Sequence, residues 1–159
     1  MMSETIPKII IICGPTASGK SELGVRLAQE LDGEIVNADS MQIYRRMDIG
    51  TAKPTIAERG GIPHHLIDVV DPEQTFSAAD YADAARKSID EIVARGKLPI
   101  VVGGTGLYIR ALLYGLVDSP APLITSVVWL PKPINTGAKE TTVAPLRIVP
   151  VENGINPPP

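Results

Sequence analysis

Eight consecutive residues near the amino terminus have the composition of a phosphate-binding loop. The segment, residues 14–21, reads GPTASGKS and fits the pattern G-x-x-x-x-G-K-[ST]. Glycines let successive backbone N–H groups point inward, Lys20 adds a positive charge, and the Ser21 hydroxyl is placed to hold Mg²⁺. A di- or triphosphate site is therefore predicted from Gly14, Pro15, Thr16, Ala17, Ser18, Gly19, Lys20 and Ser21.

Two further polar residues follow predicted strands, which is where the ligands of open α/β sheets collect. Asp39 comes after the second predicted strand, where its carboxylate would either take a proton from a nucleophile or cap the next turn. Thr105 lies in a second glycine-rich turn and would either touch a substrate or begin a helix. The spacing leaves both pairs of alternatives open.

The strand that precedes this second turn does not end in an acidic residue. Motor and signalling NTPases usually hold magnesium with an acid at that position. Here residues 98–102 run directly into Gly-Gly-Thr. The phosphate-loop pattern therefore does not by itself indicate nucleotide hydrolysis.

Two histidines and an adjacent pair of arginines lie between Asp39 and Thr105 in the sequence. His64 and His65 have no third ligand at metal spacing, so we interpret them as packing residues. Arg45 and Arg46 form a short basic pair, for which solvated surface and contact with a nucleic-acid backbone both stay open.

The elements that must position these residues alternate along the chain. Short apolar, β-branched runs indicate strands, and apolar residues at helical spacing indicate helices, one of them capped by Ser77 and ended by Gly96. Such alternation predicts a parallel sheet with helices on both faces, an α/β fold. Strands are predicted over residues 8–13, 34–37, 65–70 and 98–102, and helices over residues 21–31, 78–95 and 106–113.

Composition limits the class of protein. A chain of 159 residues with 44% hydrophobic and 21% charged residues is typical of one globular domain. Its net charge of −3 lacks the basic balance of a compact nucleic-acid binder. The single cysteine, Cys13, excludes an internal disulfide, and the first apolar run is too short for a signal peptide or membrane span. We expect a cytoplasmic protein without a membrane segment.

The composition changes near residue 119. From Pro120 onward the chain holds nine of its fifteen prolines and only five charged residues. Prolines at this spacing forbid a long helix. Residues 1–118 are therefore predicted to form the α/β domain, and residues 119–159 a mostly irregular tail with one strand-like patch at 123–130.

Four motifs in this order resemble the tRNA dimethylallyltransferase family, and the resemblance covers about residues 6–118. They are GPTASGKS (14–21), NADSMQIYRRMDIGTAKPT (37–55), PHHLID (63–68) and GGTGLYIRALLYG (103–115). The resemblance implies a three-layer fold like that of the P-loop nucleoside triphosphate hydrolases. It also implies transfer of a dimethylallyl group from dimethylallyl diphosphate to N6 of adenosine 37, beside the tRNA anticodon, with Mg²⁺ and release of diphosphate.

The same resemblance assigns roles to residues. It places residues 16–21 on the prenyl diphosphate, with Lys20 neutralising the leaving group. Asp39 would be the general base, and Thr105 would lie at the reaction channel. Contacts to the tRNA are implied for Asp39, Ser40, Met41, Gln42 and Thr105.

Family members continue through a helical region that grips the anticodon stem-loop and a basic carboxy-terminal portion. The Pro-rich tail here resembles neither, so we expect a truncated or frame-shifted chain, in the form of a monomer. Three other functions stay open from the sequence. They are a P-loop small-molecule kinase, an adenylate isopentenyltransferase acting on free nucleotides, and an inactive diphosphate-binding fragment.

Overall fold

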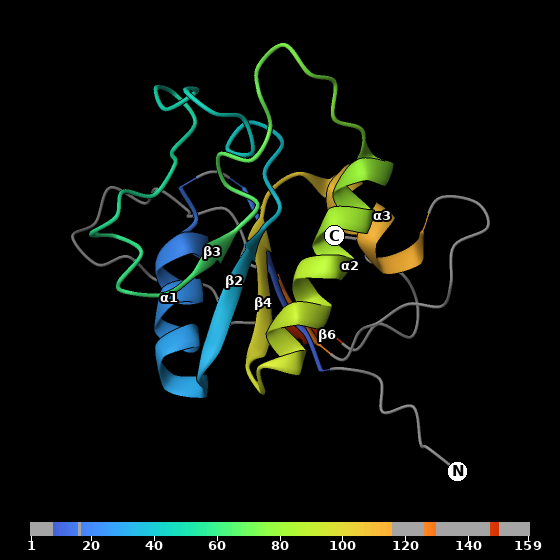
Figure 1. Ribbon diagram of the computed structural model, residues 1–159. Helices are drawn as coiled ribbons and strands as arrows, with labels where there is room; N and C mark the ends of the chain where they lie inside the picture. Colours follow the sequence, from blue (N-terminus) through green and yellow to red (C-terminus); the bar gives the residue numbers. More distant parts are fainter. Residues whose placement is uncertain (1–7, 16, 116–125, 130–146, 150–159) are drawn as a thin grey trace.

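The computed structural model describes residues 8–15, 17–115, 126–129 and 147–149, and its elements follow the predicted alternation (Figure 1). One sheet runs in the order β3-β2-β4-β1-β5-β6. Its first five strands are parallel, and β6 pairs antiparallel with β5. The elements are β1 (Ile10–Cys13), α1 (Lys20–Leu31), β2 (Gly33–Asn37), β3 (His64–His65), α2 (Ala78–Ala94), β4 (Leu98–Gly103), α3 (Gly106–Tyr114), β5 (Ser126–Trp129) and β6 (Arg147–Val149).

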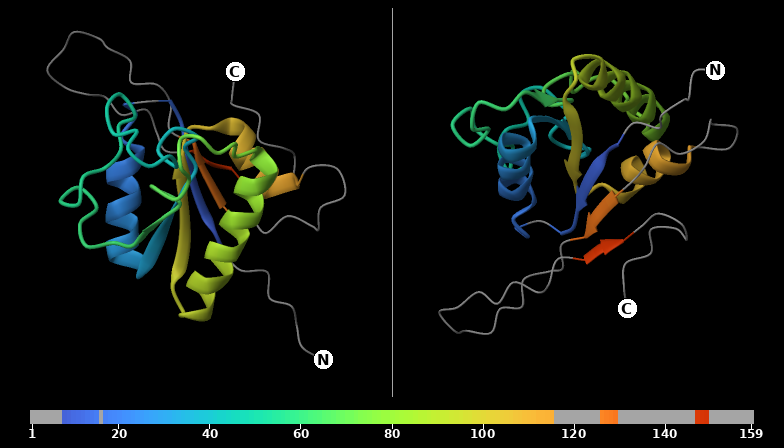
Figure 2. Two further views of the ribbon diagram at one scale, coloured as in Figure 1. Left: turned by 45° about the horizontal axis from the view of Figure 1, so that its top comes forward. Right: turned by 90° about the horizontal axis from the view of Figure 1, so that it is seen from below.

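Helices cover both faces of the sheet, with α1 on one side and α2 and α3 on the other (Figure 2). Neighbouring residues of β1 show why, because side chains of a strand alternate between its faces. Ile12 packs in one apolar cluster with Ala28 of α1, whereas Ile11 packs in a second cluster with Ile89 of α2 and Leu112 of α3. The prediction of an α/β fold with a parallel sheet is therefore confirmed.

The predicted helices agree with the structure within a residue or so at their ends. Helix α2 begins with a capping box, in which the Ser77 hydroxyl accepts from the Asp80 amide at 3.1 Å and the Asp80 carboxylate accepts from the Ser77 amide at 2.8 Å. The helix ends before Gly96, whose φ of 72° is easily reached only without a side chain. Both end signals in the sequence are confirmed.

The third strand is shorter than its sequence indicates. A strand was predicted over residues 65–70, but β3 contains only two residues. Leu66 and Asp68 take left-handed backbone angles, with φ of 63° and 56°, which are incompatible with a continuous strand. Val70 rejoins a neighbour only as an isolated bridge to Tyr44. The prediction is wrong from residue 66 onward because apolar composition cannot reveal these left-handed backbone angles.

Beyond residue 115 the structure describes only β5 and β6. The predicted strand-like patch at 123–130 contains β5, which lies parallel to β1. Strand β6 follows in a stretch where no strand was predicted. The rest of the patch lies outside the described residues, and the domain boundary at 118 stays a prediction. Within the described residues, no helix is both long and apolar enough to cross a membrane.

Candidate functional site

A cavity of about 460 Å³ opens where β2 and β4 end. The carboxyl ends of parallel strands meet at one edge of a sheet, and ligands of open α/β folds collect there. Three segments contribute most of the lining: residues 17–22, three residues of the 39–42 turn, and residues 50–54 without residue 53. The cavity thus joins the predicted phosphate loop to the segment that contains Asp39.

The loop before α1 has the backbone shape that its glycines allow. Gly19 stands at the N-cap of α1 with a φ of 84°, and Ala17 has a φ of 60°. The Lys20 ammonium group donates to the carbonyl of Pro15 at 2.6 Å, so the side chain lies over its own loop. Burial lowers the pKa of Lys20, and the negative charge of Asp39 partly opposes this.

The eight predicted loop residues do not all line the cavity. Residues 17–21 do, whereas Gly14 and Pro15 are not among the lining residues, and Thr16 lies outside the described residues. The hydroxyl oxygen of Ser18 is buried and has no hydrogen-bond partner in the described part of the chain. A buried, unpaired hydroxyl is rare, because it loses its bonds to water without replacement. Ser18 thus places an unpaired hydroxyl beside the cavity, and the exposed Ser21 is open to a ligand.

Asp39 performs the capping role that the sequence left open. Its Oδ1 accepts from the backbone amides of Met41 at 2.8 Å and Gln42 at 3.1 Å. Its Oδ2 has no hydrogen-bond partner among the residues described. Because Asp39 also lines the cavity, one oxygen can hold the turn while the other accepts a proton.

Thr105 supports this turn and does not line the cavity. Its hydroxyl oxygen accepts from the Ser40 amide at 2.9 Å, and the hydroxyl lies 3.3 Å from that of Ser40. Its own amide donates to the carbonyl of Ala38 at 3.1 Å, and the residue is the N-cap of α3. In this structure Thr105 therefore fixes the segment next to Asp39 and also begins a helix.

The glycine at the end of β4 permits this close approach. A Cβ on Gly103 would lie 2.2 Å from the carbonyl oxygen of Ala38 and 2.7 Å from its Cα. The Ala38 amide in turn donates to the carbonyl of Val102 at 2.8 Å. Backbone packed this tightly requires glycine, so the missing acid at the end of β4 has a structural reason.

The segment 50–54 is a wall of the cavity that the sequence analysis did not identify. The Gln42 side-chain amide donates to the carbonyls of Thr51 at 2.9 Å and Ala52 at 3.1 Å. The Thr51 hydroxyl donates to the carbonyl of Met47 at 2.8 Å. These bonds join the segment to the turn of Asp39. No local pattern in the sequence indicates such bonds, because they depend on two loops meeting in space.

The two histidines have separate environments. His64 lines the cavity, and its Nδ1 lies 2.8 Å from the carbonyl of Ile62, so the ring donates there; burial lowers its pKa. His65 Nε2 instead contacts the Glu34 carboxylate at 2.6 Å. Among the described residues, no three His, Cys, Asp or Glu side chains are grouped so that they could hold a metal ion.

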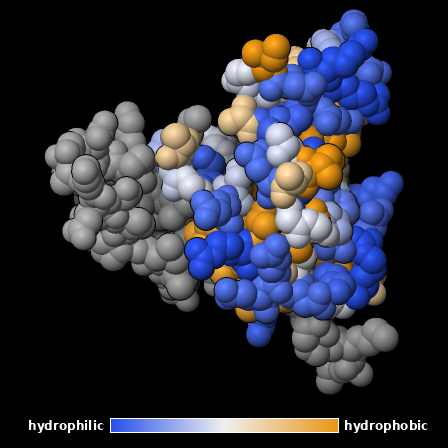
Figure 3. Space-filling model, turned by 90° about the vertical axis from the view of Figure 1, so that its left-hand side faces the viewer, coloured by the Kyte–Doolittle hydropathy of each residue, from blue (hydrophilic) through white to orange (hydrophobic). Residues whose placement is uncertain are grey.

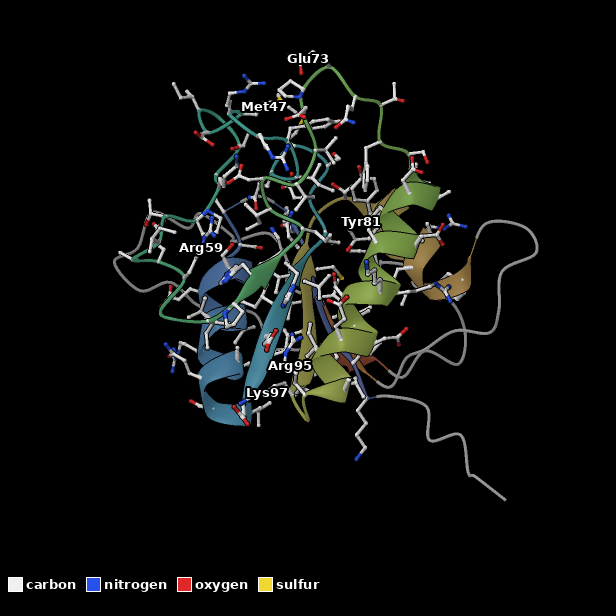
Figure 4. The ribbon with its side chains drawn as sticks, in the orientation of Figure 1. Met47, Arg59, Glu73, Tyr81, Arg95 and Lys97 are labelled. Atoms are coloured by element: carbon white, nitrogen blue, oxygen red, sulfur yellow. The ribbon has the colours of Figure 1, made fainter. Side chains whose placement is uncertain are left out.

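The basic pair Arg45 and Arg46 lies on the exposed loops beyond the sheet. Arg45 forms an ion pair with Asp71 at 2.9 Å, and Arg46 with Glu73 at 3.8 Å. Glu73 and Met47 mark this end of the molecule, and Arg95 and Lys97 mark the other (Figure 4). The face on the α1 side is mainly hydrophilic with scattered apolar groups (Figure 3). Both arginines are therefore solvated and paired with carboxylates, and contact with a nucleic-acid backbone stays open.

Comparisons with known proteins point to one family. The family model described as IPP transferase matches residues 42–140, which extends past the predicted boundary at 118. A tRNA dimethylallyltransferase 1 of Pelobacter propionicus is 72% identical over 121 residues, covering 76% of this chain and 39% of the relative. One of Citrifermentans bemidjiense is 65% identical, covering 71% of this chain and 37% of the relative.

Solved structures give the same result. A tRNA isopentenylpyrophosphate transferase of Staphylococcus epidermidis is 52% identical with a TM-score of 0.68, covering 71% of this chain and 37% of that one. A eukaryotic dimethylallyltransferase acting on tRNA is 43% identical with a TM-score of 0.68, covering 70% of this chain and 28% of that one. The chain spans about two fifths of the length of the curated relatives. With a family model over more than half of its residues, the chain belongs to the IPP transferase family.

Proposed function

We propose that the chain carries the diphosphate site and the general base of a tRNA dimethylallyltransferase. The observation that supports this most is that residues 17–21 and Asp39 line the same cavity. Such a cavity brings a leaving group and a proton acceptor together, which a transferase needs and a simple binding loop does not. On this proposal residues 14–21 are a P-loop, within a three-layer fold of the P-loop NTPase kind.

In the proposed reaction, N6 of an adenosine attacks C1 of dimethylallyl diphosphate. The N6–C1 bond forms, the C1–O bond breaks, and diphosphate leaves with the bonding electrons. Asp39 takes the N6 proton, because an exocyclic amine becomes acidic as it is alkylated; such base catalysis typically contributes about 10²–10⁴-fold. Lys20 and the backbone N–H groups at the start of α1 stabilise charge on the diphosphate. The adenine must leave its stack to reach this cavity.

The residues present fit a magnesium ion held jointly with the diphosphate. Mg²⁺ commonly takes few protein ligands and completes its shell with substrate phosphates and water. Ser21 offers its hydroxyl at the cavity, next to Lys20. When bound, the ion would offset negative charge on the leaving group.

The monomeric state and the cytoplasmic location stay predictions from the sequence.

The test is binding followed by transfer. Titration calorimetry of the 159-residue chain with dimethylallyl diphosphate and MgCl₂ should give saturable binding, and Lys20→Ala should bind about a hundredfold more weakly. Dimethylallyl diphosphate labelled in the prenyl group should then label an anticodon stem-loop RNA. Label from γ-labelled ATP on a small acceptor would favour a kinase instead. Absence of diphosphate binding by the unchanged chain would contradict the proposal.

A further inference from the structure

The wall at residues 50–54 lines the cavity although it belongs to an exposed loop. Ile49, next to it, is 99% exposed, and Gly50 and Ala52 are also exposed. The segment is neither helix nor strand, so no regular backbone ladder holds it. Its shape must therefore come from particular side-chain bonds.

Lys53 provides the most concentrated set of such bonds. Its ammonium group donates to the Tyr44 carbonyl at 3.1 Å, to Asp48 Oδ1 at 2.6 Å, and to Asp68 Oδ1. An ammonium group has three N–H donors, and all three have an acceptor here. The bonds of Lys53 thus link Tyr44 and Asp48, which precede residues 50–54 in the chain, to Asp68, which follows them. We call this set of bonds the Lys53 anchor.

The burial of Lys53 sets it apart from ordinary surface lysines. Its side chain is 6% exposed, whereas those of its partners Asp48 and Asp68 are 69% and 43% exposed. Desolvation lowers its pKa, but the hydrogen bonds and negative charges of the two aspartates outweigh this, so the net shift is upward. Removing the bonding partners of such a buried charge is costly, because the charge stays withdrawn from water and loses the bonds that offset this.

The backbone near the anchor is one that needs such support. Ala52 has a φ of 51° and Asp68 a φ of 56°, and residues with side chains take these left-handed angles at a cost. Lys53 follows Ala52 directly and bonds Asp68. Loss of the anchor would let both residues relax and would move the carbonyls that Gln42 binds.

Resting on the proposed function, we infer that Lys53 is a positioning residue for the acceptor. It fixes residues 50–54, and through the Gln42 bonds it fixes them against the turn of Asp39. Together these segments, residues 39–42 and 50–54, form what we call the acceptor wall. Lys53 itself does not line the cavity, so it acts through the wall and not by touching a ligand.

The inference predicts a split between the two ligands. In Lys53→Met the affinity for dimethylallyl diphosphate with MgCl₂ stays within about twofold of the unchanged chain, because the phosphate loop keeps its bonds. The affinity for adenosine, measured by NMR titration with inorganic pyrophosphate saturating the loop, falls roughly tenfold or more, as expected when a binding surface is displaced. Adenosine has no phosphate and so does not compete for the loop. Lys53→Arg keeps the charge and recovers part of the affinity.

Lys97→Met is the matched control. Lys97 also forms an ion pair, with Asp32 at 2.5 Å, but its side chain is 37% exposed and lies at the other end of the molecule from Met47 (Figure 4). It should change neither affinity. Asp68→Asn is a milder second variant in case Lys53→Met does not fold, and it should lower adenosine affinity alone.

The outcomes separate the two proposals. If the unchanged chain does not bind dimethylallyl diphosphate, the proposed function itself fails. If it binds the diphosphate but not adenosine, or if the folded Lys53 or Asp68 variants bind adenosine as well as the unchanged chain, the role of Lys53 is refuted while the diphosphate site stands. Equal weakening of both ligands would also refute it, because that result indicates general destabilisation.

Discussion

The phosphate loop and the acceptor wall line one cavity but are built in different ways. The loop, residues 14–21, is continuous in sequence and takes its shape from its own glycine and the start of α1. The acceptor wall comes from two separate segments, joined by the side chains of Gln42 and Lys53. A continuous loop survives changes elsewhere in the fold, whereas an assembled wall depends on every bond that joins it. These two sides of the cavity, the phosphate loop and the acceptor wall, should therefore respond differently to substitution.

Asp39→Asn should have the largest effect, and it should be confined to the acceptor side. The amide oxygen of Asn can still accept from the amides of Met41 and Gln42, so the turn and the free energy of unfolding should be almost unchanged. Transfer to RNA should fall by about 10²–10⁴-fold, because Asn cannot take a proton. Single-turnover transfer and thermal unfolding check the two parts.

Asp39→Ala is the companion variant. It should lose transfer to the same degree and also about 1 kcal/mol of stability, since the turn loses its acceptor. Diphosphate affinity should be unchanged in both variants. Transfer by Asp39→Asn at the rate of the unchanged chain would remove Asp39 as the base.

Lys20→Ala should affect the phosphate loop alone. Loss of the ammonium group removes a charge-assisted contact to the diphosphate, and the dissociation constant should rise about a hundredfold. Calorimetry with dimethylallyl diphosphate and MgCl₂ measures it, with Lys97→Ala as the control of equal charge change. Adenosine affinity in the presence of pyrophosphate that still saturates the loop should not change. Equal diphosphate affinity in the variant and the unchanged chain would mean that the site is misassigned.

Gly103→Ala should disturb the close contact between the end of β4 and Ala38, which precedes the turn of Asp39. Its Cβ would collide with the backbone of Ala38, so the strand ends must separate, and we expect a loss of about 1–3 kcal/mol in the free energy of unfolding. Gly106→Ala is the control, because a Cβ there meets no atom within 4 Å. Urea unfolding of both variants gives the comparison. Similar midpoints for the two would contradict the close approach described here.

The smallest effect is expected from a site outside the cavity, the ion cluster of Glu34 with Arg95 and His65. Arg95 donates to Glu34 at 2.6 Å and 3.2 Å, and His65 Nε2 lies at 2.6 Å. Desolvation raises the pKa of Glu34, but the bonds from Arg95 and His65 outweigh this and hold it below its usual 4.5. The cluster therefore stabilises the fold above pH 4.5 and loses this contribution as the pH falls through the lowered pKa.

Glu34→Gln should accordingly unfold more easily than the unchanged chain at neutral pH, and the two should converge in acid. Thermal unfolding between pH 3 and 7 measures the difference. Diphosphate and adenosine affinities at pH 7 should be the same in both proteins, because the cluster does not line the cavity. A stability difference that does not depend on pH would contradict this account.

Prediction from the sequence succeeded where the signal was local. The Ser77 cap and the ends of α1 and β4 depend on residues a few positions apart, and each was placed within one residue. It failed for residues 66–70, where left-handed angles interrupt an apolar run. It also missed the wall at 50–54, because residues such as Lys53 and Gln42 have no local pattern that distinguishes a buried anchor from a surface side chain.

The sequence by itself determined the alternation of strands and helices and the resemblance to a family, and it predicted the phosphate loop, since all three depend on the order of nearby residues. Only the tertiary structure decided that Asp39 caps its turn through one oxygen, that Thr105 holds this turn from outside the cavity, and that the buried Lys53 side chain bonds three residues distant from it. These features depend on contacts between residues far apart in the chain. Such contacts exist only once packing of the sheet has brought the strand ends together.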